Sequence, residues 1–266
     1  MSSAGALGPA EDLGAPGTDV AGWSRPVRAL LLDVDDTLVD TLGAMHRALV
    51  QSASRVWSGC DEEVLSAFAR RYYTDPGGFF DEYTRGERTF AQMRRARFDD
   101  AVSATRLDPV DEVTYESFEN GYRADLLAAQ RLFVDVDRLL DRAESAGVPV
   151  VLLTNSSGEV TREKMAVVGL TSRIASVVTT DTLGFGKPDP RVFAYACAAV
   201  GVPPEDVLCV GDTIGTDVVG ARRSGIRVLW LQRRDSPEPR DAGWNEPVCD
   251  PGVRVISTLD EVLDVL

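Results

Sequence analysis

The sequence of 266 residues predicts an α/β protein, a three-layer αβα Rossmann-like sandwich with a parallel central sheet and an inserted all-helical cap domain. Two observations lead to this fold class. From Val134 onward, short apolar runs alternate with helical patterns, which is typical of βαβ units in a parallel sheet. Between the first apolar run and this region, the sequence shows only helical periodicity, which indicates a separate helical insert.

The first apolar run, Leu30–Leu32, predicts a central strand covered on both faces, and acidic residues follow it directly. Asp33 and Asp35 are two positions apart, so in extended backbone their side chains leave on the same side, close enough to share a cation. Two like charges held so near need a compensating metal ion. The plainer alternative is that Asp33 and Asp36 only cap the following helix, because Asp is a favoured N-cap residue.

The helical insert begins after Asp40. Apolar residues recur there at helical spacing, and we set a cap domain at about 42–127, between the two parts of a core domain at 25–41 and 128–266. We expect the cap to set substrate choice, with 77–88 as a mobile loop that closes over the site, because this segment mixes glycines, aromatics and charges. Three neighbouring arginines are interpreted as a solvated basic face and the only histidine as a surface or packed residue: Arg94, Arg95, Arg97 and His46.

Two later apolar runs also end in polar residues. Val148–Leu153 is followed by Thr154–Ser157, a set of small hydroxyl and amide donors that opens a helix, where phosphate oxygens bind. Val207–Val210 is followed by a glycine-bearing turn with two carboxylates, Asp212 and Asp217. The carboxyl ends of strands in such sheets are where ligands bind. Further strands are predicted at 174–178, 226–231 and 253–256, and a helix at 191–200.

Lysine is rare in this chain: Lys164 and Lys187 are the only lysines among 28 basic residues. Lys187 lies in a loop between the two motifs just described. Its compact ammonium suits a contact with a nucleophilic carboxylate and a phosphoryl oxygen together, where a broad guanidinium would not fit. We expect Lys164, in the charged run Arg162–Lys164 of a helix, to be an exposed surface residue.

In order, these segments resemble the four motifs of the haloacid dehalogenase-like (HAD) hydrolases, and the resemblance covers the chain from about Val27 onward. The motifs are Asp33-Val34-Asp35-Asp36-Thr37, Thr154 to Ser157, Lys187-Pro188, and Gly211-Asp212 to Asp217. The resemblance implies that Asp33 is a nucleophile that forms an aspartyl-phosphate, and that Asp35 is the general acid and then the base. It further implies that Thr154 and Asn155 line the substrate site, with Thr154 on the transferring phosphoryl group. Lys187 would neutralise charge between that group and Asp33.

The resemblance also implies a Mg²⁺ ion held by the Asp33 carboxylate, the Asp35 backbone carbonyl and Asp212, with Asp217 in a supporting or water-mediated role. The family usually has glycine where this chain has Asp36. A general acid must carry a proton, so we expect Asp35 to hold one in the substrate complex. Its neighbours Asp33 and Asp36 would raise its pKa above the ordinary value of about 3.9.

The expected function is Mg²⁺-dependent removal of phosphate from a small phosphorylated metabolite, of the sugar-phosphate or nucleotide class. Dehalogenation needs no acid two residues after the nucleophile, because halide leaves without a proton, so Asp35 favours phosphoryl transfer. Phosphonate hydrolysis needs a cap-domain lysine, and no lysine precedes Lys164. Two alternatives stay open: a β-phosphoglucomutase-like phosphomutase, because no residue decides whether water or a second hydroxyl takes the phosphoryl group, and a non-catalytic HAD-like binding module.

Composition bounds the partners and the setting. The formal net charge of −14 and the pI near 4.6 argue against nucleic acid polymers, which call for basic surfaces. No apolar run approaches the roughly 20 residues of a membrane span. Residues 1–24 lack a basic start and an apolar core, so they are interpreted as a flexible tail. Four cysteines show no metal-ligand spacing, which suits a reducing compartment, so we expect a cytoplasmic protein: Cys60, Cys197, Cys209 and Cys249. We expect this enzyme to be a monomer or a homodimer.

Overall fold

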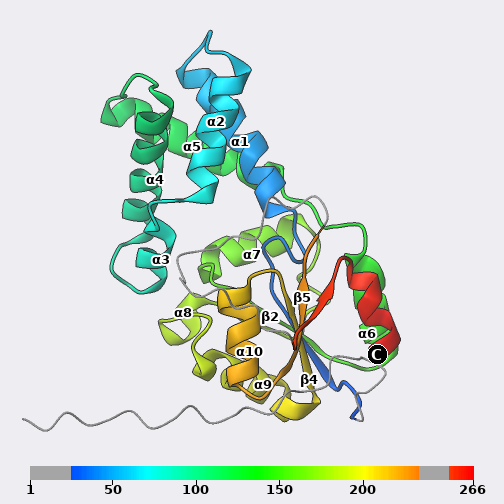
Figure 1. The fold of residues 1–266 in the computed structure, drawn as a ribbon. Helices are drawn as coiled ribbons and strands as arrows, with labels where there is room; N and C mark the ends of the chain where they lie inside the picture. The colour runs from blue at the N-terminus through cyan, green and yellow to red at the C-terminus, as the bar shows by residue number, and fades with distance from the viewer. Residues whose placement is uncertain (1–24, 234–251) are drawn as a thin grey trace, which may run out of the picture.

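The computed structural model describes residues 25–233 and 252–266, so the tail interpretation of residues 1–24 and the prediction for Cys249 fall outside it. In the described part of the chain, six parallel strands form one sheet in the order β3-β2-β1-β4-β5-β6 (Figure 1). This is the order of a doubly wound sheet, in which the crevice for ligands opens where the order reverses, between β1 and β4. The strands are β1 Ala29–Leu32, β2 Val150–Leu153, β3 Ser176–Val178, β4 Val207–Gly211, β5 Arg227–Leu231 and β6 Arg254–Ile256.

Alternate residues of the central strands pack on opposite faces of the sheet. In β1, Leu30 and Leu32 belong to one hydrophobic cluster, whereas Ala29 and Leu31 belong to the other. All of β1 is buried, which is why it reads as a continuous apolar run in the sequence. The predicted three-layer sandwich with a parallel sheet is confirmed.

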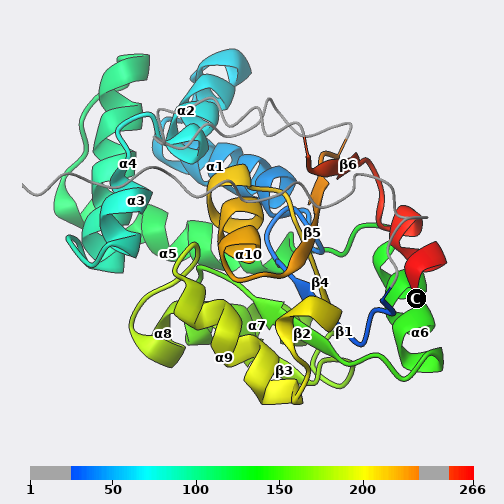
Figure 2. The ribbon, with the colours of Figure 1, turned by 60° about the horizontal axis from the view of Figure 1, so that its bottom comes forward.

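Helices cover both faces of the sheet, as Figures 1 and 2 show from two sides. Side chains of α6 (Val136–Ser145), α7 (Gly158–Val167) and η4 (Leu259–Val265) pack into one cluster. Side chains of α9 (Pro190–Val200) and α10 (Val219–Arg223) pack into the other. The predicted helix at 191–200 is confirmed as α9. Three short elements complete the core: α8 Thr180–Leu183, η2 Pro204–Asp206 and η3 Ile214–Val218.

The segment between β1 and α6 is helical, as expected, and Figure 1 shows its helices gathered at one end of the sheet. Its own core is rich in aromatic rings, with Phe98 packed against Phe68 and Phe118 at ring-centre distances of 5.7 and 4.8 Å. The helices are α1 Thr41–Val56, α2 Glu62–Thr74, α3 Phe79–Thr84, α4 Phe90–Thr105 and α5 Glu112–Ala128.

Two chain segments connect this helical insert to the sheet, and they lie side by side. Val39 and Leu132 form an antiparallel bridge, and the Asp40 N–H donates to the Arg131 carbonyl at 3.0 Å. Arg131 also forms an ion pair with the Asp40 carboxylate at 2.9 Å. The start of α1 is thereby fixed relative to the loop that follows β1.

Two expectations for the cap are wrong. Arg94 and Arg97 are buried, because Arg94 pairs with Glu119 at 2.6 Å and the Arg97 Nε donates to the Tyr72 carbonyl at 2.7 Å; only Arg95 keeps a partly exposed side chain. The segment 77–88, expected as a loop, contains helix α3, which is held by bonds from its first residues to the Asp75 carboxylate. Within residues 25–233 and 252–266, no helix combines the length and apolar character needed to cross a membrane.

Candidate active site

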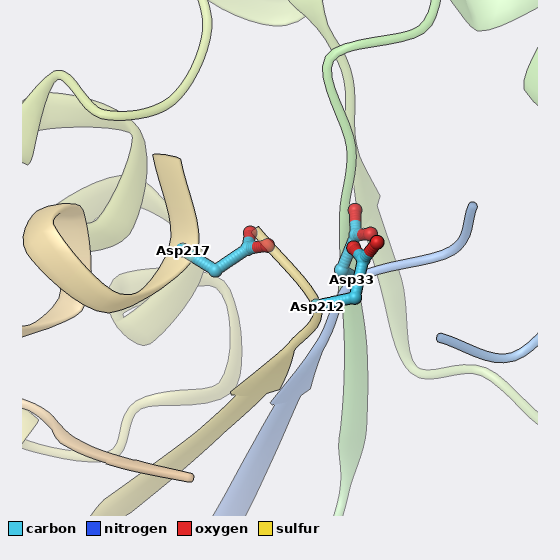
Figure 3. A group of neighbouring side chains, drawn as sticks. All are labelled: Asp33, Asp212 and Asp217. Atoms are coloured by element: carbon cyan, nitrogen blue, oxygen red, sulfur yellow. The ribbon is translucent and has the colours of Figure 1, made fainter. Parts of the chain in front are cut away.

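Three carboxylates meet at the carboxyl ends of the central strands. Asp33 follows β1, Asp212 follows the neighbouring strand β4, and Asp217 lies in the helical turn η3. One oxygen of each carboxylate lies within 4.8 Å of the others, and Figure 3 shows Asp217 extending toward Asp33 and Asp212. Gly211 allows this approach, because a Cβ at that position would lie 2.3 Å from the Asp217 Cγ. The structure therefore brings together three acids from motifs that are far apart in the sequence.

The ammonium of Lys187 lies between two of these acids. Its Nζ donates to the Asp33 Oδ1 and to the Asp217 Oδ1, each at 2.6 Å. The side chains of Lys187, Asp33 and Asp217 are only 4, 9 and 1 % exposed. Burial opposes the charge of Lys187, but the two carboxylates more than offset it and raise the pKa of the ammonium above its usual value. Lys187 is therefore held as a cation.

The four side chains Asp33, Asp212, Asp217 and Lys187 do not balance their charges among themselves. This set holds one ammonium, which contacts Asp33 and Asp217, and three carboxyl groups. Burial raises the pKa of Asp33 to about 7, and the charge of Asp217 adds to this rise while that of Lys187 opposes it. Carboxylate oxygens are the ligands that hard divalent cations prefer. In donor type and in charge, the three acids therefore fit a divalent metal ion.

The motif after β2 contributes a hydroxyl and an amide. Thr154 is buried, and its side-chain oxygen accepts a bond from the Ser156 N–H at 3.2 Å, which leaves the hydroxyl proton out of that bond. Asn155 was expected in the substrate site, but its side chain makes two bonds to protein backbone. It donates to the Lys187 carbonyl at 2.9 Å and accepts from the Lys187 N–H at 2.7 Å. Asn155 thus fixes the loop that carries the lysine.

Asp35 has its own set of partners, separate from those of Asp33. The chain leaves the extended conformation directly after Asp35, because Asp36 has φ 59°. The Asp35 carboxylate accepts bonds from the Thr41 hydroxyl at 2.6 Å, from the Ser156 hydroxyl at 3.2 Å and from the Lys164 ammonium. Its carboxylate therefore does not belong to the group of three acids.

The expected rise in the pKa of Asp35 is not found. Burial alone would raise it, but the charge and hydrogen bond of Lys164, with the bonds from Thr41 and Ser156, lower the pKa to about 2. The expectation of an exposed Lys164 is also wrong. Its side chain is 6 % exposed, because α7 directs it toward Asp35. Sequence spacing alone could not identify this pair, since the two residues are 129 positions apart.

The backbone conformation at Asp36 is one that favours glycine, the residue usual at this position in the family that the motifs resemble. Its φ of 59° lies in the left-handed region, which glycine adopts without a steric cost and which Asp tolerates better than most residues. The Asp36 carboxylate accepts a bond from the Leu42 N–H at 2.8 Å, in the first turn of α1. The capping alternative therefore holds only in part: Asp36 binds one N–H of the first turn, but the N-cap residue of α1 is Asp40, and the Asp33 carboxylate is bound by Lys187.

Arg233, which the sequence did not indicate as part of the site, supports the loop after β1. Arg233, after β5, donates to the Thr37 carbonyl at 2.6 Å and pairs with both oxygens of Asp135 at 3.0 and 3.1 Å. The Asp135 carboxylate also accepts from the Thr258 hydroxyl and the Leu259 N–H. One buried arginine thus connects the loop after β1 to the N-terminus of α6 and to η4. The signal in the sequence was an arginine two residues after the end of an apolar strand.

Comparison with known proteins identifies a family and several relatives of this chain. The model of the haloacid dehalogenase-like hydrolase family matches residues 27–225. A phosphoserine phosphatase from Thermus thermophilus is 37 % identical over 124 residues, which span 47 % of this chain and 47 % of that protein. The human N-acylneuraminate-9-phosphatase is 27 % identical over 82 % of this chain and 90 % of its own length. The structure of the HAD-hydrolase YfnB from Bacillus subtilis, bound to magnesium, superposes with a TM-score of 0.69 at 20 % identity, over 91 % of this chain and 99 % of that one.

Proposed function

The chain belongs to the haloacid dehalogenase-like hydrolases, and from this premise we propose that it is a Mg²⁺-dependent phosphatase of small phosphorylated metabolites. The single observation that carries the proposal is the cluster of Asp33, Asp212, Asp217 and Lys187 at the carboxyl ends of β1 and β4. A phosphate monoester repels a carboxylate nucleophile, so a site for this reaction must add positive charge. Lys187 supplies part of it and the three acids fit a metal ion that supplies the rest.

In this proposal the residues carry out two successive displacements. An oxygen of the Asp33 carboxylate forms a bond to phosphorus, and the bond from phosphorus to the ester oxygen breaks. The pKa of Asp35 is about 2 in the free site, so in this proposal Asp35 takes up a proton as the substrate binds. It gives that proton to the departing oxygen, then takes a proton from the water that attacks the aspartyl-phosphate, which restores Asp33 and releases phosphate. Thr154 and Lys187 bind the phosphoryl oxygens, and Asn155 positions Lys187 through its backbone.

When bound by Asp33, Asp212 and the Asp35 carbonyl, with Asp217 in support, Mg²⁺ would add charge stabilisation for the phosphoryl oxygens. Asp35 also separates this proposal from dehalogenation, the reaction in the family's name. A halide needs no proton to leave, whereas an alkoxide does. The Asp35 carboxylate is held among hydrogen-bond donors beside the phosphate motif, since Ser156 belongs to that motif. This placement favours phosphoryl transfer.

The substrate proposed is a phosphorylated sugar or nucleotide-class metabolite, handled in the cytoplasm. The similarity to a phosphoserine phosphatase and to an N-acylneuraminate-9-phosphatase supports a small phosphorylated metabolite as the substrate. The free thiols of Cys60, Cys197 and Cys209 support a reducing compartment. Phosphate release from a panel of phosphorylated metabolites would identify the substrate. The same reactions are checked for transfer of the phosphoryl group to a second hydroxyl, which would instead indicate a mutase.

The proposal is tested with p-nitrophenyl phosphate, with and without Mg²⁺. We expect Mg²⁺-dependent release of nitrophenolate and phosphate that Asp33→Asn abolishes. Asp137→Asn is the matched control, because this carboxylate is 73 % exposed on α6, where it pairs with Arg173. Unchanged turnover in Asp33→Asn, or no release from any phosphorylated compound, would contradict the proposal and favour a binding module.

A further inference from the structure

Both lysines of the chain are buried next to an acid of the first motif, although the proposed reaction uses only one of them. Lys187 pairs with Asp33, and Lys164 pairs with Asp35. Lys164 belongs to none of the four motifs. It lies in the last turn of α7, and its neighbours Arg162 and Glu163 are exposed while its own side chain turns inward.

The two oxygens of Asp35 are held differently. Oδ1 accepts both the Lys164 ammonium and the Thr41 hydroxyl, the latter at 2.6 Å. Lys164 also donates to the Thr41 oxygen at 3.2 Å, so Asp35, Lys164 and Thr41 form a closed set of three contacts. Oδ2 accepts the longer bond of 3.2 Å from the Ser156 hydroxyl, and a hydroxyl can rotate away or accept in turn.

Lysine suits this position better than arginine. An ammonium is a compact charge with three donors, so it can meet a carboxylate and a hydroxyl oxygen in a small buried space. The set also joins three parts of the fold, since Lys164 comes from α7, Asp35 from the loop after β1, and Thr41 from the first residue of cap helix α1.

We propose that Lys164 is a positioning residue that anchors the Oδ1 of Asp35, together with Thr41, so that Oδ2 is the oxygen that exchanges a proton with the substrate. The inference rests on the proposed function, in which Asp35 is the general acid. Anchoring one oxygen leaves the other fixed in direction, and a fixed direction is what proton transfer in a transition state requires. Without the ammonium, the carboxylate keeps two hydroxyl donors and loses its strongest contact.

The test compares two leaving groups in kcat/KM, which reports the step that forms the aspartyl-phosphate. Nitrophenolate leaves p-nitrophenyl phosphate without a proton, whereas phenyl phosphate, with a poorer leaving group, depends more on the acid. Loss of the Lys164 ammonium also raises the pKa of Asp35, so each variant is assayed at its own pH optimum. We expect Lys164→Met to lower kcat/KM for phenyl phosphate roughly tenfold more than for p-nitrophenyl phosphate, a part of the roughly hundredfold or larger contribution of general acid catalysis. Arg162→Met, an exposed site on the same helix, changes neither value.

Two further variants keep the test decisive. Thr41→Val removes the other anchor of Oδ1 and is expected to shift the same ratio in the same direction, which covers the case in which Lys164→Met does not fold. In the Asp35→Asn background, Lys164→Met is expected to leave the ratio of the two substrates unchanged, because the residue acts through Asp35.

Each outcome has a distinct meaning. An equal loss for both substrates, or no loss, overturns the anchoring role, while Asp33→Asn still decides the proposed phosphatase function separately. A loss ratio in Lys164→Met that persists in the Asp35→Asn background also overturns it. If Asp35→Asn itself loses no more on phenyl phosphate than on p-nitrophenyl phosphate, then Asp35 is not the acid, and both the acid role and the anchoring role fail.

Discussion

Replacing Arg233 by Met is expected to destabilise the protein strongly, although the residue lies outside the four motifs. Arg233 and Asp135 form a buried pair, with side chains 10 and 3 % exposed. The guanidinium also donates to the Thr37 carbonyl and lies over the Phe133 ring, 3.7 Å from its centre. Removing one partner of a buried ion pair costs about 3–5 kcal/mol, because it leaves an uncompensated charge.

We expect a cost at the lower end of this range of about 3–5 kcal/mol, because two other donors still bond the Asp135 carboxylate when Arg233 is replaced. Asp135 keeps the Thr258 hydroxyl at 2.8 Å and the Leu259 N–H at 2.9 Å. We expect Arg233→Met to lower the free energy of unfolding by about 3 kcal/mol. In a chain of this size that corresponds to a fall in Tm of roughly 6–12 °C.

Urea titration and thermal melts measure the loss, and the chain offers a matched control. Arg138→Met removes an arginine that joins α6 to η4 through an ion pair with Asp260, in which the two side chains are 58 and 39 % exposed. An exposed pair of this kind contributes about 0–1 kcal/mol. If Arg233→Met costs no more than Arg138→Met, the reasoning from burial is refuted.

The pH dependence of the same difference follows from Asp135. Burial raises the pKa of this carboxyl, but the bonds and charge of Arg233, with those of Leu259 and Thr258, lower it below its usual value. A group with a lowered folded-state pKa stabilises the fold above its unfolded-state pKa, and the contribution disappears as pH falls through the folded-state value. The difference between wild type and Arg233→Met should therefore be constant from about pH 8 to about pH 5 and shrink only below about pH 4. A difference that shrinks near neutral pH would contradict this assignment.

Three further outcomes are expected. Gly211→Ala places a Cβ 2.3 Å from the Asp217 Cγ, so it should lower kcat and cost about 1–3 kcal/mol in a thermal melt; wild-type turnover would contradict the close approach. In urea titration, Asp36→Gly should keep the free energy of unfolding within about 1 kcal/mol of wild type, because relief of the positive φ offsets the lost bond to Leu42. Asp36→Ala loses the bond without this relief and should lower the free energy of unfolding by about 1–2 kcal/mol. Equal losses in the two variants would refute the backbone argument. A chelator should abolish turnover of p-nitrophenyl phosphate and Mg²⁺ restore it. In calorimetry, Mg²⁺ at about 100 Kd should stabilise the wild type by about 2.7 kcal/mol and Asp212→Asn much less, and equal stabilisation would place the ion elsewhere.

The fold and the acids of the site were predictable because both are encoded locally. A buried parallel strand is a short apolar run, and the residue after it lies at the ligand-binding edge of the sheet. Asp33 and Asp212 could therefore be placed from the sequence alone, and both lie where expected, at the ends of β1 and β4. The loop that carries Lys187 could be recognised, but not the Asn155 side chain that fixes it.

The buried arginines of the cap were missed although a local signal existed. Arg94 and Arg97 share one face of α4 with Phe98 and Ala101, at separations of three and four residues. Helical periodicity places such residues toward the core. The interpretation as a solvated face followed residue type instead. A long side chain can be buried when its charge is paired and its planar group stacks on rings, and Arg94 both pairs with Glu119 and lies 4.7 Å from the centre of the Tyr122 ring.

The two lysines show where prediction from sequence stops. Lys187 lies 154 positions from Asp33, and Lys164 lies 129 positions from Asp35. Residues so far apart meet only through the fold, which places β2 beside β1 and packs α7 and α9 on opposite faces of the sheet. Two acids separated by one residue cannot both stay charged in a buried site unless each has its own counter-charge. Lys164 gives Asp35 a counter-charge, whereas Lys187 divides its charge between Asp33 and Asp217. Burial therefore raises the pKa of Asp33 to about 7 despite Lys187, while at Asp35 the charge and hydrogen bond of Lys164 outweigh burial and lower the pKa to about 2.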